Sequence, residues 1–203
     1  GGSTVVQDDD LIGQFRYLAG DGTDLQSEVA NITVSIDGTP GGNDVPGRIT
    51  FATTNDGGNT STERMRISKD GHVTKPTNLC LSYTASSSLN YTSSGTLIYA
   101  TEVFDVANSN AYNTSTGVFT APVAGIYNIY HEYYNVTGYN AMTKLEKSTN
   151  GGSSFSQIKI FGRQRSDEAY TSAGFSHLVQ ANANDQFKIT WYDGQVHINN
   201  TFT

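Results

Sequence analysis

The residues that most often do chemistry are few in this sequence and widely spaced. The four histidines are His72, His131, His177 and His197, and the single cysteine is Cys80. A structural zinc site takes four such ligands, usually in closely spaced pairs, and no such pairs occur here. The spacing therefore predicts no metal centre, and one cysteine leaves no partner for a disulfide within the chain.

The sequence also offers few candidate residues for acid–base or nucleophilic catalysis. Asp167 and Glu168 are adjacent carboxylates, but neighbouring charges in a loop are usually only solvated. Residues 174–177 (GFSH) lack the closing glycine of a nucleophile elbow and fall in an expected strand. We therefore expect a protein that is not an enzyme and that carries no cofactor.

Asp21 and Asp24 are weak candidates for calcium ligands. They lie in a glycine-containing run, GDGTD at residues 20–24, that could wrap oxygen atoms around a hard cation. No glutamate closes the run at the distance that a calcium loop requires. A tight turn is the favoured interpretation.

Tyrosine is the more promising residue for recognition, because its flat apolar ring and its hydroxyl suit contacts with sugars and proteins. Several tyrosines, and two arginines near them in sequence, lie near expected strand ends or loops. These receptor-binding candidates are Tyr133, Tyr134, Tyr139, Tyr170, Tyr192, Arg163 and Arg165. Buried packing would explain half of the tyrosines equally well, and the arginines could simply be part of an exposed loop.

Composition indicates which elements must position these residues. Of 203 residues, 36% are hydrophobic and 15% charged, and turn formers separate short β-branched or aromatic runs, so we expect an all-β protein. The net charge of −7 disfavours nucleic acid as a partner. No apolar run approaches the length needed for membrane insertion.

Three alternating segments in the first third, residues 31–36, 48–54 and 63–68, are predicted strands, with turn glycines after each. Each has one narrow apolar face and little else to bury. A segment this small makes little core alone, which indicates that it finds apolar surface on other copies of the chain.

This first third resembles a module of tailed-bacteriophage tail fibres and other appendages. The resemblance rests on PGRITF at residues 46–51, TERMRI at 62–67 and DGHV at 70–73, with GQFRY at 13–17, DGTD at 21–24 and SIDGTPG at 35–41. It covers most of residues 10–76. It implies an intertwined trimeric β shaft segment that precedes a terminal head, in a virion appendage outside the cell.

The remainder, after a proline-containing joint at residues 75–78, is organised around GVFTAPVAGIYNI at residues 117–129. The spacing of Tyr112, Phe119, Gly125 and Tyr127 resembles the globular head of complement component 1q, which is related to the tumour-necrosis-factor fold. The resemblance implies a ten-stranded jelly-roll head that is trimeric and binds other molecules. The usual closing strand is missing unless residues 196–202 supply it.

Several aromatic and aliphatic residues of this head, together with one histidine, are candidates for its core or for a trimer axis. They are Tyr112, Phe119, Tyr127, Ile129, His131, Phe187 and Trp191. At an axis, three copies of His131 would face one another and could bind an ion or sense pH. A single satisfied histidine in the core is the favoured alternative.

Together these patterns predict a shaft segment at residues 1–78 and a head at 79–203. The expected function is multivalent attachment of a homotrimeric tail-fibre tip to a bacterial surface glycan or protein, with other virion proteins on the N-terminal side. The alternative is a structural virion component without a receptor, such as a capsid fibre, a connector or a trimerisation head. The opening residues, Gly1 to Ser3, carry no start methionine and indicate a piece of a longer protein.

Overall fold

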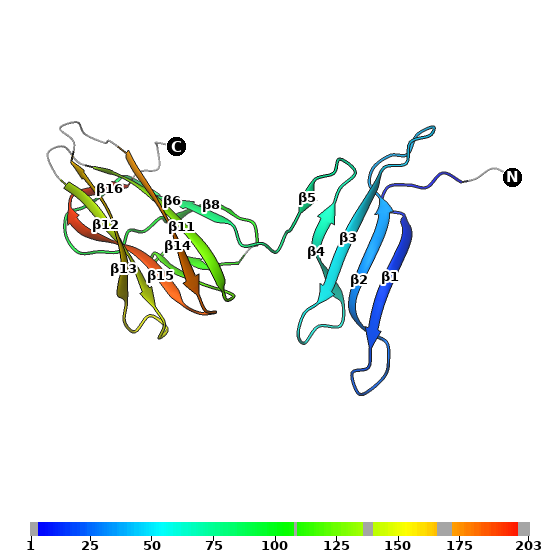
Figure 1. The fold of residues 1–203 in the computed structure, drawn as a ribbon. Helices are drawn as coiled ribbons and strands as arrows, with labels where there is room; N and C mark the ends of the chain where they lie inside the picture. The colour runs from blue at the N-terminus through cyan, green and yellow to red at the C-terminus, as the bar shows by residue number, and fades with distance from the viewer. Residues whose placement is uncertain (1–3, 108, 136–139, 166–171, 199–203) are drawn as a thin grey trace. The chain divides into compact units, whose positions relative to one another are not determined.

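The computed structural model describes residues 4–107, 109–135, 140–165 and 172–198, with only the backbone described for 163–165. Over these ranges the chain is all-β and contains no helix, so no helix that could cross a membrane is found in them. The contacts divide the chain into two compact units, Gly1–Asn78 and Leu79–Thr203 (Figure 1). The two units are described separately.

The first unit is one antiparallel sheet whose five strands follow each other in chain order. The strands are β1 (Leu11–Ala19), β2 (Ser27–Ile36), β3 (Gly47–Thr54), β4 (Ser61–Ile67) and β5 (Val73–Thr74). The three strands predicted from alternation correspond to β2, β3 and β4, whereas alternation did not predict β1. Gly38, Gly57 and Gly71 have positive φ angles in the turns where the sequence placed them, a conformation that glycine adopts without strain.

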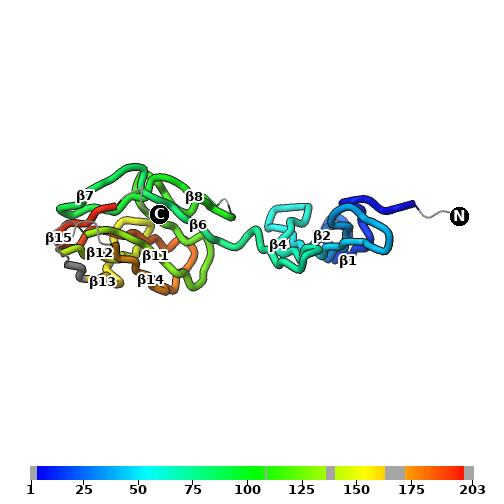
Figure 2. Tube along the Cα trace, turned by 90° about the horizontal axis from the view of Figure 1, so that it is seen from above, coloured from blue at the N-terminus to red at the C-terminus, as the bar shows by residue number. Residues whose placement is uncertain are grey.

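The second unit contains eleven strands over the described residues, one more than the ten expected. They are β6 (Leu81–Thr84), β7 (Leu89–Tyr91), β8 (Thr101–Asp105), β9 (Tyr112–Asn113), β10 (Val118–Thr120), β11 (Gly125–Asn135), β12 (Asn140–Ser148), β13 (Ser156–Arg165), β14 (Ser172–Ala181), β15 (Gln186–Gly194) and β16 (Val196–Ile198). One sheet has the order β13-β12-β15-β10-β9, a second β14-β11-β16-β7, and β6 pairs with β8. Figure 2 shows the chain trace of this unit from a second direction.

The two larger sheets of the second unit enclose one hydrophobic core. Leu145 and Phe187 come from the first of these sheets, Tyr133 and Val196 from the second, and all four are buried in the same cluster. Because successive side chains of a strand point to opposite faces, each sheet sends alternate residues into this layer. The unit is therefore a β sandwich that buries its core within one chain.

Two of the expectations for strands in the head have different outcomes. Residues 96–99 do not form a strand; Thr96 makes only an isolated bridge to Thr190 of β15. The closing strand is β16, which lies within residues 196–202 and pairs with both β11 and β7. Gly117 opens the central signature with a φ of 69°, and a Cβ atom there would lie 2.8 Å from the carbonyl oxygen of Leu97.

Candidate binding surfaces

Strand β11 separates the predicted core residues from the exposed ones by alternation. Tyr127, Ile129 and His131 turn toward the core, while Ile126 and Tyr130 point outward and are exposed. The sequence pattern found this alternation but assigned both the core and a trimer axis to the inward set. In the folded chain only the outward set is available to another molecule.

His131 lies between the two sheets of the head, with 4% of its surface exposed. Its Nε2 atom is 2.7 Å from the hydroxyl oxygen of Thr143, and its ring packs against Tyr133, Phe161 and Phe175. Its Nδ1 atom is buried without a hydrogen-bond partner among the residues that the structure describes. Burial lowers the pKa of His131 to about 4, so the imidazole is neutral at neutral pH.

This position overturns the idea that three copies of His131 face one another. A ring enclosed between two sheets of its own chain cannot reach an axis shared with other chains. The other axis candidates, Tyr112, Phe119, Tyr127, Ile129, Phe187 and Trp191, are likewise buried or half-buried. All except Tyr112 belong to the core cluster or pack against it, and Tyr112 contacts Tyr83 and Tyr99.

Two of the tyrosines predicted for receptor contact are not available for it. Tyr133 is 0% exposed, and its hydroxyl donates to the carbonyl oxygen of Ala141 over 2.9 Å. Burial raises the pKa of Tyr133 to about 12. Tyr134 is also buried, against the ring of His197. For these two tyrosines the structure supports the alternative of buried packing, because pairing of β11 with β14 and β16 encloses both rings.

Of the remaining candidates, Tyr192 near the end of β15 is 41% exposed and remains available for contact. Tyr139, Tyr170 and the side chains of Arg163 and Arg165 lie outside the described residues. Cys80 is exposed immediately before β6, not buried on a strand as its residue type suggests.

Asp21 and Asp24 hold the turn between β1 and β2. One oxygen of Asp21 accepts the backbone N–H groups of Thr23 and Asp24, and the other accepts the hydroxyl of Ser27. These bonds lower the pKa of Asp21 to about 2. The carboxylate of Asp24 accepts the N–H of Gln26. No cluster of metal-ligating side chains was found within the described ranges.

A groove of about 330 Å³ lies on the outer face of the β12–β15 pair in the head. Its lining residues are Ser94, Gly95, Thr96, Lys144, Glu146, Lys188, Thr190 and Trp191. Register places Lys144 opposite Thr190 and Glu146 opposite Lys188, on the face that alternates with the core residues Leu145 and Ile189. The sequence prediction included only Trp191 of this set, since the pairing joins two strands that are far apart in the sequence.

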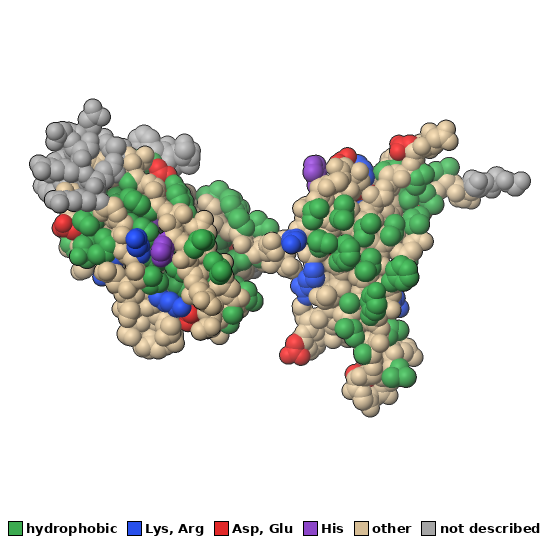
Figure 3. All heavy atoms as spheres, in the orientation of Figure 1, with side chains coloured by type: hydrophobic (Ala, Val, Ile, Leu, Met, Phe, Trp, Pro, Cys, Tyr) green, Lys and Arg blue, Asp and Glu red, His purple; other side chains and the backbone are tan. Residues whose placement is uncertain are grey.

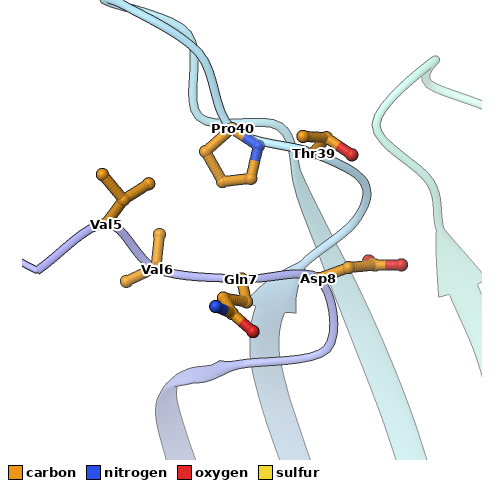
Figure 4. A pocket seen from close by; sticks show the side chains of 6 residues that line it. All are labelled: Val5, Val6, Gln7, Asp8, Thr39 and Pro40. Carbon is orange, nitrogen blue, oxygen red and sulfur yellow. The ribbon is translucent and has the colours of Figure 1, made fainter.

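A second hollow, of about 360 Å³, lies in the first unit between the N-terminal segment and the loop after β2. Figure 4 shows its lining, with Val5 and Val6 on one segment and Thr39 and Pro40 on the other. Its one carboxylate, that of Asp8, accepts the backbone N–H groups of Gly38 and Asp9. Because the Asp8 carboxylate is already bonded to the backbone, we interpret this hollow as a contact between two loops and not as a ligand site.

The sheet of the first unit has one apolar face that the described residues of this unit leave exposed. Strand register aligns Phe15, Ile32, Phe51 and Met65 in one cross-strand row. A parallel row consists of Val34, Ile49, Ile67 and Val73. Phe15 is 73% exposed, and Figure 3 shows hydrophobic side chains gathered over this unit. We call these two rows the apolar face; an exposed area of this kind marks an interaction site.

The opposite face of the same sheet is polar and satisfies its own charges. One carboxylate oxygen of Glu28 accepts hydrogen bonds from the side-chain amide of Asn31 at 2.7 Å and the hydroxyl of Ser61 at 2.5 Å. The other accepts one from the guanidinium group of Arg16 at 2.6 Å. These bonds lower the pKa of Glu28 to about 2. Arg66 pairs with Glu63 on this face as well. The polar face is thus complete within one chain, and the apolar face is not.

The head carries a smaller apolar area on the outer face of β11 and β14. Ile126 is 75% and Leu178 66% exposed, and Tyr130 lies on the same face. Polar residues such as Asn128 and Gln180 lie beside them in the register. This area is a second candidate contact surface.

Comparisons with known proteins identify structural likeness only. No family model and no curated protein matches the chain. Similar solved structures include the Eiger TNF of S. frugiperda, at 11% identity and a TM-score of 0.44, over 62% of this chain and 92% of that one. Murine APRIL is 12% identical with a TM-score of 0.37, over 56% of this chain and 98% of that one. The globular domain of the zebrafish complement 1qA protein is 14% identical with a TM-score of 0.34, over 55% of this chain and 92% of that one.

Proposed function

We propose that three copies of this chain form the distal part of a bacteriophage tail fibre and attach the virion to a bacterial surface. The observation that carries the proposal is the uncovered apolar face of β1–β5. Each large side chain removed from water contributes about 1.5–3 kcal/mol, so a row such as Phe15, Ile32 and Phe51 strongly favours association.

Other copies of the same sheet are the partners that fit this face best. The opposite face carries the Glu28 network, so a sheet can turn its apolar rows toward other sheets and leave that network in water. Three such sheets around an axis cover one another and close the assembly. The resemblance of residues 46–51, 62–67 and 70–73 to trimeric appendage shafts supports three copies in particular.

The head would add a second contact between copies through Ile126, Tyr130 and Leu178. These side chains replace Tyr127, Ile129 and His131 as the proposed axis residues, because they are the ones that point away from the core. Three heads present three equal sets of outer surfaces. Linked sites of this kind raise the effective concentration of a ligand and give strong attachment from weak contacts.

The proposed partners are a glycan or protein of the bacterial surface and, on the N-terminal side, other virion proteins. The first test is the mass of the full chain in solution by light scattering, where three times the chain mass is expected and a single-chain mass would refute the assembly. The second test is the binding of labelled protein to intact bacteria. A trimer that binds none of a panel of hosts would favour a purely structural part of the virion.

A further inference from the structure

The groove on β12 and β15 places two lysines around one glutamate. Glu146 is buried, and its Oε1 atom pairs with the ammonium group of Lys144 at 2.9 Å. Its Oε2 atom accepts the hydroxyl of Thr190 at 2.9 Å and lies 3.9 Å from the ammonium group of Lys188. Two cations therefore share one anion, in a chain whose net charge is −7.

Both ammonium groups retain donors for another partner. Each carries three N–H bonds and keeps part of its side chain exposed, 27% for Lys144 and 22% for Lys188. Lys188 also lies over the ring of Phe155, 4.0 Å from its centre. The ring and Glu146 together restrict where this ammonium group can lie, which reduces the entropy lost when it binds an anion.

The rest of the lining suits the hydroxyl groups of a sugar. Ser94 and Thr96 supply hydroxyls on one wall, where they can exchange hydrogen bonds with the hydroxyls of a sugar. This wall is fixed to β15, because the N–H of Trp191 donates to the carbonyl of Gly95 and that of Leu97 to the carbonyl of Ile189, each over 2.8 Å. The volume of the groove, about 330 Å³, lies at the small end of the range for ligand sites.

We propose that this groove binds an acidic sugar unit, with the sugar carboxylate bound by the exposed sides of the ammonium groups of Lys144 and Lys188 and the sugar hydroxyls against Ser94 and Thr96. Glu146 pairs with both ammonium groups and so competes with the sugar carboxylate for them. The inference rests on the proposed attachment function for its biological partner, which would be a surface polysaccharide rich in uronic acids.

The test is calorimetric titration of the full chain with trigalacturonate, compared with neutral galactotriose and with sodium phosphate. Binding is expected for trigalacturonate, with an affinity that falls as sodium chloride rises from about 50 to about 500 mM. Galactotriose and phosphate should bind at least about tenfold more weakly. Equal binding of galactotriose would overturn the role of the carboxylate, and equal binding of phosphate would overturn the role of the sugar.

Variants locate the site. Lys144→Gln with Lys188→Gln should weaken trigalacturonate binding at least about tenfold, whereas Lys75→Gln with Lys159→Gln, which removes the same charge from exposed positions elsewhere, should not. Glu146→Gln should keep or strengthen binding, because it frees both ammonium groups. Loss of binding in Glu146→Gln, or equal loss in the control pair, would refute the proposal.

Two further measurements keep the result decisive. If the double variant does not fold, as judged by Trp191 fluorescence, Lys188→Arg and Glu146→Gln decide the question: binding retained in both supports the site, and binding lost in either refutes it. A trimer that binds bacteria but not trigalacturonate would refute the groove alone. A single-chain mass would refute the proposed fibre and leave the calorimetric result to judge the groove.

Discussion

The first unit and the second unit are built from the same kind of short, alternating strand, but only the second folds its strands into two layers. In the first, Phe51 belongs to a row that faces solvent, whereas Phe187 of the second is 1% exposed between two sheets. A one-layer sheet can satisfy its polar face with its own side chains, as Glu28 shows, but it has nothing to place on its apolar face. The head thus encloses its core within one chain, whereas the described residues of the first unit leave its apolar face exposed.

The largest effect is expected from a charge placed on the apolar face. Phe51→Asp puts a carboxylate in the middle of the row that the proposed trimer buries, where an unpaired charge is very costly. We expect the concentration at which copies dissociate to rise at least about 100-fold, measured by light scattering across a dilution series.

The matched control is Thr50→Asp, one residue away on the polar face and opposite Arg66. It adds the same charge and should leave the assembly intact. Dissociation of both variants to the same extent would mean that the apolar face is not the contact.

The next effect isolates the head. Phe187→Ala removes a ring that is fully enclosed by the sandwich, and we expect the free energy of unfolding of the head to fall by about 3–5 kcal/mol. Trp191 is the chain's single tryptophan, so its fluorescence during denaturant titration reports this unit. If Phe51→Asp shifted the Trp191 transition as far as Phe187→Ala does, the units would not be independent.

A smaller effect is the change in the stability of the head with pH. Burial lowers the pKa of His131 from 6.5 to about 4, so between these values the unfolded chain binds a proton that the folded head does not. Stability is therefore complete above about pH 6.5 and decreases as the pH falls, by up to about 3 kcal/mol below pH 4.

His131→Gln keeps a group that can bond Thr143 and removes the titration, so its head should lose less stability over the same range than the original chain does. The comparison uses the Trp191 transition at pH 7, 5.5 and 4. Identical pH dependence in both proteins would show that other groups, such as His197, account for it.

The smallest effect is expected from calcium. The carboxylate oxygens of Asp21 already accept hydrogen bonds from the backbone N–H groups of Thr23 and Asp24 and from the hydroxyl of Ser27. Millimolar calcium or a chelator should therefore leave the thermal unfolding temperature of both units unchanged. A clear upward shift with calcium would show that the turn opens to bind the ion. Calorimetry of the full chain distinguishes the two outcomes.

Much of the local structure could be predicted from the residues alone. Alternation at residues 31–36 and 48–54 identified strands that exist, and the turn glycines at 38, 57 and 71 lie where the chain turns. The pattern failed where tertiary pairing decides. The sequence left both surface contact and buried packing open for Tyr133 and Tyr134, and the pairing of β11 with β14 and β16 encloses both rings.

The candidate site shows the same limit. Lys144 and Glu146 are separated by one residue, as are Lys188 and Thr190, so the sequence could show that each pair shares a face of its strand. It could not show that the two strands are neighbours, nor that the loop at Ser94 closes the groove beside them.

By itself the sequence determined the all-β character, the alternation within each strand and the scarcity of catalytic groups, because these depend on residue types and on contacts close along the chain. Only the tertiary structure decided which alternate face is enclosed, which leaves His131 in a core and Phe15 in solvent. The physical reason is that burial depends on a second layer, and a strand carries no local signal of whether its own chain supplies that layer.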